Sequence, residues 1–443
     1  MNTKGDRILL KCGHKFSLSG INVLIGPNNS GKSTLLREVA GDLRNTKIVE
    51  DITPKVWNEE SVKEFARQNG RPDFKYVLPA PSGGEWRKDN WDSLKPIFEH
   101  NRDEILKHSF RLAWSREATV LGGSKRLGIV IDQDYDGIAS AEGNPKNLFN
   151  RVRANKEIRN SIRKYVGEVL VDQTFCLWTP KTTKLRAFIA HTEPPESIEY
   201  ADSPEALKFF QSQATPLADY SDGICAYVGI IVNVIAEPSS MFLIDEPEAF
   251  LHPSLCFLLG KALQKISKEK GIDCICATHS PHFLRGLLAS DPSTVSVTRL
   301  TYENSKASAK TISSEDLLSI IRDPLLNSLG VTEALFHSRV VVGEGDSDRS
   351  FYSEINNRLL DFTHVGISNC LFINAQNKQT IARIISLLRG VGVPAAAITD
   401  VDVFKEGGVT FSRICEAVGL RSANKKAVET LRSSVHTALS AAA

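Results

Sequence analysis

The sequence lacks a stretch that could cross a membrane. Its longest apolar segment, Ile224–Ala236, contains Asn233 and is shorter than the ~20 residues that a membrane-spanning helix needs. No basic segment followed by an apolar one opens the chain, as a secretory signal would. We therefore expect a cytoplasmic protein without a membrane partner.

The sequence also lacks a large net charge and a cysteine framework. Its 54 Lys and Arg residues nearly balance 52 Asp and Glu residues, which leaves a formal net charge of +2. A globally basic nucleic-acid binder is therefore excluded, and any contact with DNA has to come from local patches. The eight cysteines are scattered, and the closest pair, Cys274 and Cys276, is too tightly spaced for a usual zinc site.

One glycine-rich segment, residues 26–34, fits the phosphate-loop pattern G-x-x-x-x-G-K-[ST] at every specified position. The apolar run Ile21–Ile25 before it predicts a buried strand, and Thr34–Ala40 after it predicts a helix. Backbone N–H groups in such a loop cradle phosphates, while Lys32 reaches the β- and γ-phosphates and the Ser33 hydroxyl binds Mg²⁺. The residues expected to bind a nucleoside triphosphate here are Gly26, Asn28, Asn29, Ser30, Gly31, Lys32, Ser33 and Thr34.

Two later apolar strands end in polar residues suited to the same site. The strand predicted at 240–247 ends in Asp245, which would hold Mg²⁺ through water, and Glu246, which would polarise the attacking water. A second strand, Cys274–Ala277, is followed closely by His279, a candidate sensor of the γ-phosphate. Taken alone, Asp245 and Glu246 are also consistent with an acidic turn that ends a strand. Taken alone, His279 is also consistent with a structural histidine.

A polar turn, Tyr220–Gly223, precedes the apolar helix predicted at Ile224–Ala236. With this turn, the motif order resembles an ABC-type ATPase head of the branch that includes the RecF, SMC and OLD (overcoming lysogenisation defect) proteins. The resemblance implies that the nucleotide is ATP. It also implies that Ser221 and Gly223 contact the ATP bound to another subunit, so the protein would form a homodimer or a higher homo-oligomer. It further implies roles for Asp245 (Walker B), Glu246 (catalytic), Glu248 to His252 (D-loop), His279 (switch) and Gln133 (Q-loop candidate).

The segments between these motifs are less specific. Residues 42–115 predict a helical insertion whose best helices are Glu59–Arg67 and Trp91–Lys107. A hairpin-like turn then leads into a strand predicted at Leu127–Ile131. Within residues 146–170, a basic helix predicted at Leu148–Val166 presents either a solvated face or a contact for a phosphate backbone.

Near the C-terminus, strands and helices alternate again. Strands at 339–343, 370–374 and 394–402 with helices between them predict a parallel sheet whose carboxylates gather at one edge. Because alternate residues of a strand face the same way, we expect Asp400 and Asp402 to project together. Clustered carboxylates of this kind select a hard cation, Mg²⁺ or Mn²⁺.

Glu-Gly-x-x-Asp at 344–348, with Asp-x-Asp about 55 residues later, resembles the Toprim domain of topoisomerases, primases and OLD nucleases. The resemblance implies that Glu344 is a general acid/base or metal ligand, Asp400 and Asp402 are metal ligands, and Asp348 supports them. Lys378 is expected in a loop that faces DNA. The basic residue expected beyond the Asp-x-Asp strand is left open among Lys405, Lys425 and Lys426.

We therefore expect an α/β protein of 443 residues with three parts. These are an ABC-type ATPase domain at 1–312, a helical linker at 313–336 and a Rossmann-like Toprim domain at 337–443. The Toprim domain is either compact or truncated. The resemblance implies an ATP-binding and ATP-hydrolysing, Mg²⁺-dependent DNA endonuclease or nickase of OLD type in antiphage defence, in which the ATPase dimer controls the Toprim nuclease. A helicase-like subunit, or a reverse transcriptase with its RNA–DNA product, is an implied partner. The alternative is a RecF/SMC-like, ATP-switched DNA-binding scaffold with an inactive Toprim.

Overall fold

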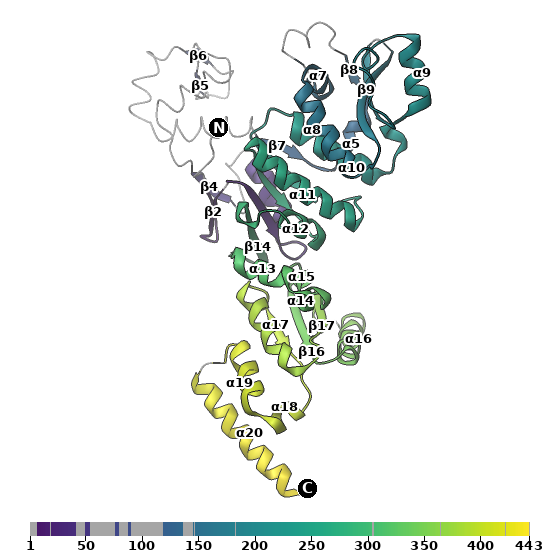
Figure 1. The fold of residues 1–443 in the computed structure, drawn as a ribbon. Coiled ribbons are helices and arrows are strands. Elements are labelled where there is room, and N and C mark those ends of the chain that lie inside the picture. The colour runs from purple at the N-terminus through teal and green to yellow at the C-terminus, as the bar shows by residue number, and fades with distance from the viewer. Residues whose placement is uncertain are drawn as a thin grey trace. The chain divides into compact units, whose positions relative to one another are not determined.

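A computed structural model describes residues 7–40, 49–53, 76–78, 87–89 and 118–442, except residues 18, 136–144, 146, 182, 304, 364 and 421 (Figure 1). The helices expected at Glu59–Arg67 and Trp91–Lys107 lie outside these residues. Contacts divide the chain into two compact units, and each is described by itself below. The first comprises residues 1–22, 33–245 and 266–275, and the second comprises 23–32, 246–265 and 276–443.

The division runs through two central strands of a six-stranded sheet with the order β15-β14-β3-β13-β12-β7. Its strands are β3 (Ile21–Ile25), β7 (Ala118–Leu121), β12 (Met241–Asp245), β13 (Asp273–Ala277), β14 (Val295–Glu303) and β15 (Lys306–Ile312). β7 and β12 pair in parallel, and β3 is buried throughout, as its apolar composition predicts. The predicted strands at Ile21–Ile25, before Asp245 and at Cys274–Ala277 are confirmed.

The first unit contains several smaller sheets and the helices between the motifs. The strands are β1 (Arg7–Leu10), β2 (Lys15–Ser17), β4 (Val49–Thr53), β5 (Tyr76–Leu78), β6 (Arg87–Asp89), β8 (Gln133–Asp134), β9 (Thr174–Lys181), β10 (Lys184–Ala190) and β11 (Ala214–Pro216). The helices are α1 (Lys32–Ala40), α5 (Gly123–Leu127), η2 (Gly128–Val130), α7 (Leu148–Ala154), α8 (Lys156–Gly167), α9 (Pro204–Gln213), η3 (Leu217–Asp219) and α10 (Asp222–Ala236).

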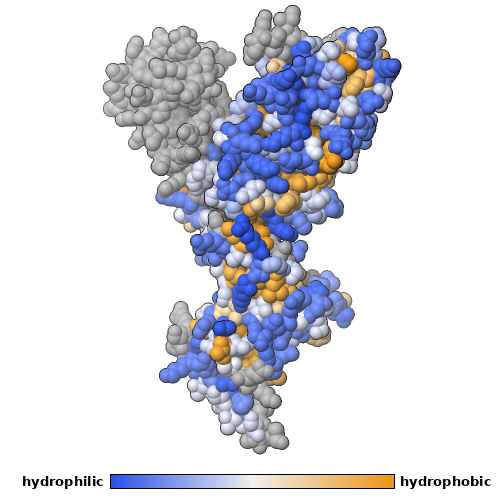
Figure 2. Space-filling view, in the orientation of Figure 1, coloured by the Kyte–Doolittle hydropathy of each residue, from blue (hydrophilic) through white to orange (hydrophobic). Residues whose placement is uncertain are grey.

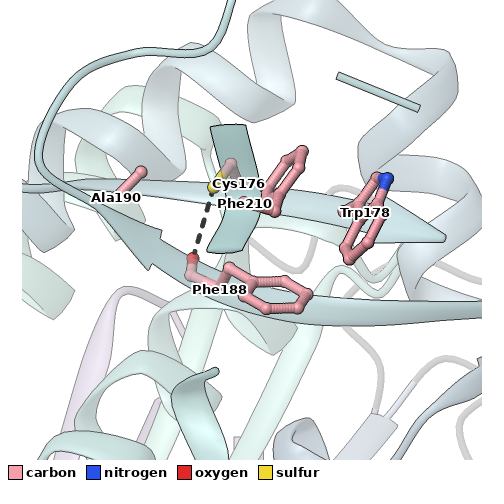
Figure 3. Close-up of a cluster of buried hydrophobic side chains, with 5 residues drawn as sticks. All are labelled: Cys176, Trp178, Phe188, Ala190 and Phe210. Carbon is pink, nitrogen blue, oxygen red and sulfur yellow. Dashed lines mark hydrogen bonds between the residues drawn. The ribbon is translucent and has the colours of Figure 1, made fainter. Parts of the chain in front are cut away.

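A small aromatic core fixes the β9–β10 hairpin against α9. The rings of Trp178 and Phe210 stack with their centroids 4.8 Å apart, and Phe188 lies against both (Figure 3). The Cys176 thiol donates to the Phe188 carbonyl at 3.7 Å. Because this cluster joins residues of β9, β10 and α9, it supplies the apolar burial that a short antiparallel sheet needs.

The strand expected at Leu127–Ile131 is wrong, because helix α5 and the 3-10 turn η2 occupy this segment instead. The segment packs closely on α10, where a Cβ added at Gly229 would lie 1.8 Å from the Arg126 carbonyl oxygen. Arg126 itself is buried. A tertiary contact thus overrides the local β propensity of the sequence Leu-Gly-Ile-Val-Ile.

The single basic helix expected at 148–166 is two helices, α7 and α8, because Asn155 is extended and caps α8 by accepting from the Glu157 and Ile158 N–H groups. Most of the basic side chains of α7 and α8 have acidic partners within the chain, such as Arg163 with Glu199 at 2.7 Å and Lys164 with Glu269 at 3.1 Å. The face shown in Figure 2 is mostly hydrophilic over α7, α8 and α9. These pairs favour a solvated structural face over a phosphate contact.

The second unit continues from the phosphate loop to the C-terminal helices. Its helices are α11 (Pro253–Lys270, which extends into the first unit), α12 (Pro281–Leu287), η4 (Pro292–Thr294), α13 (Ser314–Arg322), α14 (Pro324–Ser328), α15 (Val331–Ala334), α16 (Asp346–Phe362), α17 (Lys378–Gly390), α18 (Asp402–Glu406), α19 (Gly408–Ala417) and α20 (Ser422–Ala442). Its second sheet has the order β17-β16-β18, with β16 (Arg339–Gly343), β17 (Cys370–Asn374) and β18 (Ala395–Ala397) all parallel. The parallel sheet expected near the C-terminus is confirmed.

The last strand is shorter than expected. β18 ends at Ala397, and Asp402 is the first residue of α18. The interpretation that Asp400 and Asp402 alternate on one extended strand is therefore wrong. The sequence Asp-Val-Asp-Val-Phe has no residue that stops a helix, and helix α18 starts within it.

Candidate functional sites: a phosphate loop and a carboxylate pair

The phosphate loop directs its lysine onto its own backbone. Lys32 is 5% exposed, and its ammonium donates to the Gly26 carbonyl at 2.9 Å, the Pro27 carbonyl at 2.8 Å and the Ser30 hydroxyl at 3.2 Å. Asn28 and Asn29 are exposed at the tip of the loop. The ammonium is thus removed from water, and neutral oxygen atoms of the loop hold it in place. Phosphate oxygens carry more negative charge than these acceptors and can replace them as partners of the ammonium.

The loop needs glycine at its first position. Gly26 has a φ of +135°, and a Cβ there would lie 2.1 Å from the Leu300 carbonyl oxygen of β14. Gly31 also has a positive φ, +93°. Because side chains are strained in this conformation, the two glycines let the backbone turn directly from β3 into α1.

The first turn of α1 meets the end of β12. The Ser33 hydroxyl donates to Asp245 Oδ1 at 3.0 Å, although 212 positions separate the two residues. Both are expected Mg²⁺ residues, and Thr34 follows them as a half-buried residue of α1. The structure therefore brings together a hydroxyl and a carboxylate that hard cations prefer as ligands.

Arg126 is a neighbour that sequence reasoning missed. Its Nη2 donates to the Asp245 backbone carbonyl at 3.1 Å, so this buried guanidinium holds the end of β12. No motif indicates it, because its position depends on the packing of α5 against α10.

The two strand ends that carry Glu246 and His279 are tied together by Glu248. Glu248 Oε1 accepts the His279 N–H at 2.6 Å, and its Oε2 accepts the Thr278 hydroxyl at 2.7 Å. Burial raises the pKa of Glu248, and these hydrogen bonds oppose the rise. Glu246 is exposed with a φ of +49°, and its N–H donates to the Ala277 carbonyl at 2.8 Å. The acidic turn and the histidine turn are therefore one hydrogen-bonded unit.

The remaining ATPase candidates lie at helix starts. Ser221 is exposed and caps α10, where its hydroxyl accepts the Ile224 N–H at 3.5 Å, while Gly223 is buried within the first turn. The Gln133 side-chain carbonyl accepts the Phe149 N–H at 3.1 Å and so supports the start of α7. In the described structure Gln133 has this role in the fold.

The second candidate site follows β16. Burial, and after it the charges of Asp402 and Asp400, raises the pKa of Glu344 above its ordinary value, while a hydrogen bond from the Asp400 N–H opposes the rise. Among the described residues, Glu344 Oε2 is buried and has no hydrogen-bond partner. A proton or a cation stabilises a buried carboxylate oxygen that lies beside other carboxylates.

Lys378 supplies one positive charge at this site. Its ammonium donates to Asp402 Oδ2 at 2.8 Å, and this hydrogen bond is the main cause that lowers the pKa of Asp402. The expectation that Lys378 lies in a loop is wrong, because it is the first residue of α17, which Asn377 caps. Its contact with DNA stays a prediction. Asp402 Oδ1 is buried, and it has no hydrogen-bond partner in the described part of the chain.

Asp348 and Asp400 are placed differently. Asp348 Oδ2 accepts the Gly345 N–H at 2.9 Å and caps α16, and Asp400 is exposed. Within the described residues, no group of three or more His, Cys, Asp or Glu residues is close enough to hold a metal ion. The four predicted ligands are thus not assembled into one cluster.

The oxygen atoms that remain nonetheless fit a divalent cation. Glu344 Oε2, Asp402 Oδ1 and the Asn374 side-chain oxygen are all buried without a partner among the residues described. Asn374 ends β17 directly beside Gly343 in the register of the sheet, and sequence reasoning missed it. Carboxylate and amide oxygens are ligands that Mg²⁺ and Mn²⁺ accept, and burial without a partner is costly for each of them.

Of the three lysines left open by the sequence, the structure describes the side chains of Lys425 and Lys426. Lys425 donates to Glu416 at 2.5 Å, Lys426 is exposed, and the Lys405 side chain lies outside the described residues. Lys378 is the basic residue that the fold places against Asp402.

Comparison with protein families gives a known domain type for two parts of the chain. The phosphate loop at 26–34 precedes the first match, whereas Glu344, Lys378 and Asp402 lie within the second. A family model of AAA domains, whose description also names the AbiEii toxin and type IV toxin–antitoxin systems, matches residues 131–285. The model of the TOPRIM domain of overcoming lysogenization defect protein-like proteins matches residues 335–402. The chain therefore carries an ATPase domain followed by an OLD-like Toprim domain, as the motif order predicts. This architecture makes it an ATPase and a metal-dependent endonuclease by class.

Comparison with solved structures finds SMC head domains and a component of an ABC transporter complex. An SMC head bound to the C-terminal winged-helix domain of ScpA is 13% identical, with a TM-score of 0.41, over 71% of this chain and 98% of that chain. The SMC head domain from Thermotoga maritima is 15% identical, with a TM-score of 0.35, over 70% and 98% of the two chains. The protein cbiO1 of an ABC transporter complex from Clostridium perfringens is 14% identical, with a TM-score of 0.37, over 72% and 87%.

No curated protein matches the chain. Among the residues that the structure describes, no helix has the length and apolar character needed to cross a membrane.

Proposed function

We propose that this protein is an ATP-controlled, Mg²⁺-dependent DNA endonuclease or nickase of OLD type that acts in cytoplasmic antiphage defence. One observation carries the nuclease proposal: beside the Lys378 ammonium, Glu344 and Asp402 each keep a buried carboxylate oxygen that has no hydrogen-bond partner among the described residues. Such an arrangement is costly unless a cation and a substrate phosphate complete it.

Glu344 and Asp402 have different roles at this site. The hydrogen bond from Lys378 lowers the pKa of Asp402, whereas burial and the neighbouring carboxylates raise the pKa of Glu344. Glu344 can therefore donate or accept a proton at the scissile phosphodiester, and Asp402 serves as the permanent anion. A bound Mg²⁺ or Mn²⁺ would supply Lewis-acid activation, with Glu344, Asp402, Asp400 and Asn374 as the residues that would hold it.

The ATPase site supports the controlling role. Lys32 presents its ammonium within the phosphate loop, and the Ser33–Asp245 hydrogen bond places two hard oxygen ligands together. Glu246 is exposed at the end of β12, where it can orient a water molecule, and Glu248 holds the backbone of His279. ATP binding by one subunit would use the exposed Ser221 of the other, which is the basis for proposing a homodimer or a higher oligomer.

Plasmid cleavage tests the proposal directly. Supercoiled DNA is incubated with the protein in Mg²⁺ or Mn²⁺, with and without ATP, beside Asp400→Ala/Asp402→Ala and a control, Asp361→Asn, which alters an exposed carboxylate of α16. We expect the wild type and the control to nick the plasmid and the double mutant to lose at least about 100-fold of that activity. Equal cleavage by the double mutant would exclude the Toprim site as the nuclease.

One observation favours a second candidate, an ATP-switched DNA-binding scaffold. No three-residue metal cluster is assembled among the described residues, and Lys378 already neutralises Asp402. A scaffold predicts that the same double mutant binds DNA normally and that the wild type cuts nothing in either metal. Adding a helicase-like subunit, or a reverse transcriptase with its RNA–DNA product, tests whether cleavage needs a partner.

A further inference from the structure

Arg299 is a buried cation in the middle of β14. It is 2% exposed, and burial lowers its pKa to about 10 while the charge of Glu303 opposes the shift. Its guanidinium donates to three backbone carbonyls, those of His337 at 2.7 Å, Gly392 at 2.8 Å and Leu335 at 3.3 Å. A guanidinium has a rigid fork of donors, so these bonds fix three chain segments relative to one another.

The three acceptors lie just before the strands that carry the Toprim carboxylates. Leu335 and His337 precede β16, whose end is followed by Glu344. Gly392 precedes β18, beyond which Asp400 and Asp402 lie. Since β16 and β18 pair in parallel, a shift of Arg299 acts on the starts of both strands at once.

The residue next to Arg299 contacts the phosphate loop. The Leu300 carbonyl oxygen lies against Gly26, where it would be 2.1 Å from an added Cβ, and β14 is the neighbour of β3 in the sheet. Consecutive residues of one strand therefore contact the start of the phosphate loop and the starts of the Toprim strands.

The partner strand strengthens this connection. Lys310 of β15 is paired with Arg299 in the register of the hairpin, and its ammonium donates to the Gly390 carbonyl. Its side chain also packs on Gly392, where an added Cβ would lie 3.0 Å from Lys310 Cδ. The β14–β15 hairpin thus holds the turn between α17 and β18 from two positions.

We propose that Arg299 is a positioning residue that transmits the state of the phosphate loop to the Toprim carboxylates. Close-packed interiors transmit small displacements, and three buried carbonyls that share one guanidinium move with it. This inference rests on the proposed function, because it names how ATP controls the Toprim site. Arg299 touches neither ATP nor DNA in this scheme, so its loss changes the response to ATP and leaves each site in place.

The test compares wild type, Arg299→Lys, Arg299→Gln and a control, Arg322→Gln, which alters an exposed arginine of α13. Hydrogen exchange of residues 335–344 and 392–402 is measured with and without ATP. We expect ATP to change exchange there at least about 5-fold in wild type and control, the lower end of usual coupling. In Arg299→Gln we expect the ratio of exchange rates with and without ATP to fall to about 1, which means that ATP has no effect. Arg299→Lys should show an intermediate ratio, because lysine keeps the charge but has fewer hydrogen-bond donors.

Three accompanying measurements separate coupling from damage. Thermal melting establishes that each variant is folded, ATP affinity is expected to stay within about 2-fold of wild type, and Lys32→Ala is expected to abolish the exchange response. If Arg299→Gln is unfolded, Arg299→Lys alone decides. A wild-type response retained in a folded Arg299 variant, or no response in wild type, overturns the inference. Because exchange does not require cleavage, absent plasmid nicking would count against the nuclease proposal and leave the coupling result standing.

Discussion

The Ser33 hydroxyl donates a 3.0 Å hydrogen bond to Asp245 Oδ1, which joins the phosphate loop to the acidic strand end 212 positions later. The Asp245 carbonyl in turn accepts from the buried Arg126. The fold therefore holds together Ser33 and Asp245, the two residues expected to bind Mg²⁺, and each expected nucleotide residue can be tested by substitution.

Lys32→Ala is expected to lower ATP affinity by at least about 100-fold, because charge-assisted bonds to the phosphates are lost at a desolvated position. Isothermal titration measures the affinity. Lys208→Ala, an exposed lysine of α9, is the matched control and is expected to bind like wild type. Unchanged affinity in Lys32→Ala would mean that residues 26–34 do not bind the triphosphate.

Gly26→Ala is expected to destabilise the protein by about 2–4 kcal/mol, since the new methyl group meets the Leu300 carbonyl and the φ of +135° disfavours a side chain. Urea unfolding gives the free energy. Gly128→Ala is the control, because a Cβ there meets nothing within 4 Å, and we expect a change within about 0.5 kcal/mol. Similar values for both variants would contradict the tight fit at Gly26.

Glu344 predicts a pH dependence of stability. Its pKa is raised in the folded state, so the folded protein binds the proton more tightly than the unfolded chain does. The stability that this proton contributes is present below the pKa of the unfolded chain and is lost as pH rises through the pKa of the folded protein. In EDTA at neutral pH, Glu344→Gln is therefore expected to raise the melting temperature. Glu354→Gln, which removes an exposed ion pair with Arg358, should change it little.

With added Mn²⁺, we expect wild type to melt at a higher temperature than Glu344→Gln, the reverse of the order in EDTA. The ion stabilises wild type, whereas in Glu344→Gln it has one ligand fewer. Melting curves in EDTA and in Mn²⁺ give both comparisons. A lower melting temperature for Glu344→Gln in EDTA would show that the carboxylate is not destabilised by its neighbours.

Lys378→Met is expected to tighten Mn²⁺ binding by several-fold and to lower cleavage, because the ammonium that competes for Asp402 is removed along with a cation for the phosphate. Mn²⁺ titration and plasmid nicking are measured on the same preparation. Lys426→Met, an exposed lysine of α20, should change neither. Weaker Mn²⁺ binding in Lys378→Met would mean that the lysine supports the metal ligands and does not compete with them.

Several features of the site could be predicted from sequence because they depend on neighbours along the chain. The loop at 26–34 has its glycines, lysine and serine at fixed spacing, and the runs before Asp245 and Glu344 are apolar enough to be buried strands in any α/β fold. The alternation of strands and helices likewise predicts a parallel sheet. Where only a short segment was involved, as at Leu127–Ile131 and Asp400–Asp402, local pattern was a poor guide.

The sequence by itself determined the kinds of residue at each strand end, and hence the two chemistries, because hydrophobic period and loop spacing act over a few residues. Only the tertiary structure decided that Lys378 pairs with Asp402, that Arg126 holds Asp245, and that Arg299 spans three carbonyls. Each of these contacts joins elements far apart in the chain. Their geometry follows from how helices and sheets pack, and packing satisfies buried polar groups with whichever partners the fold brings near.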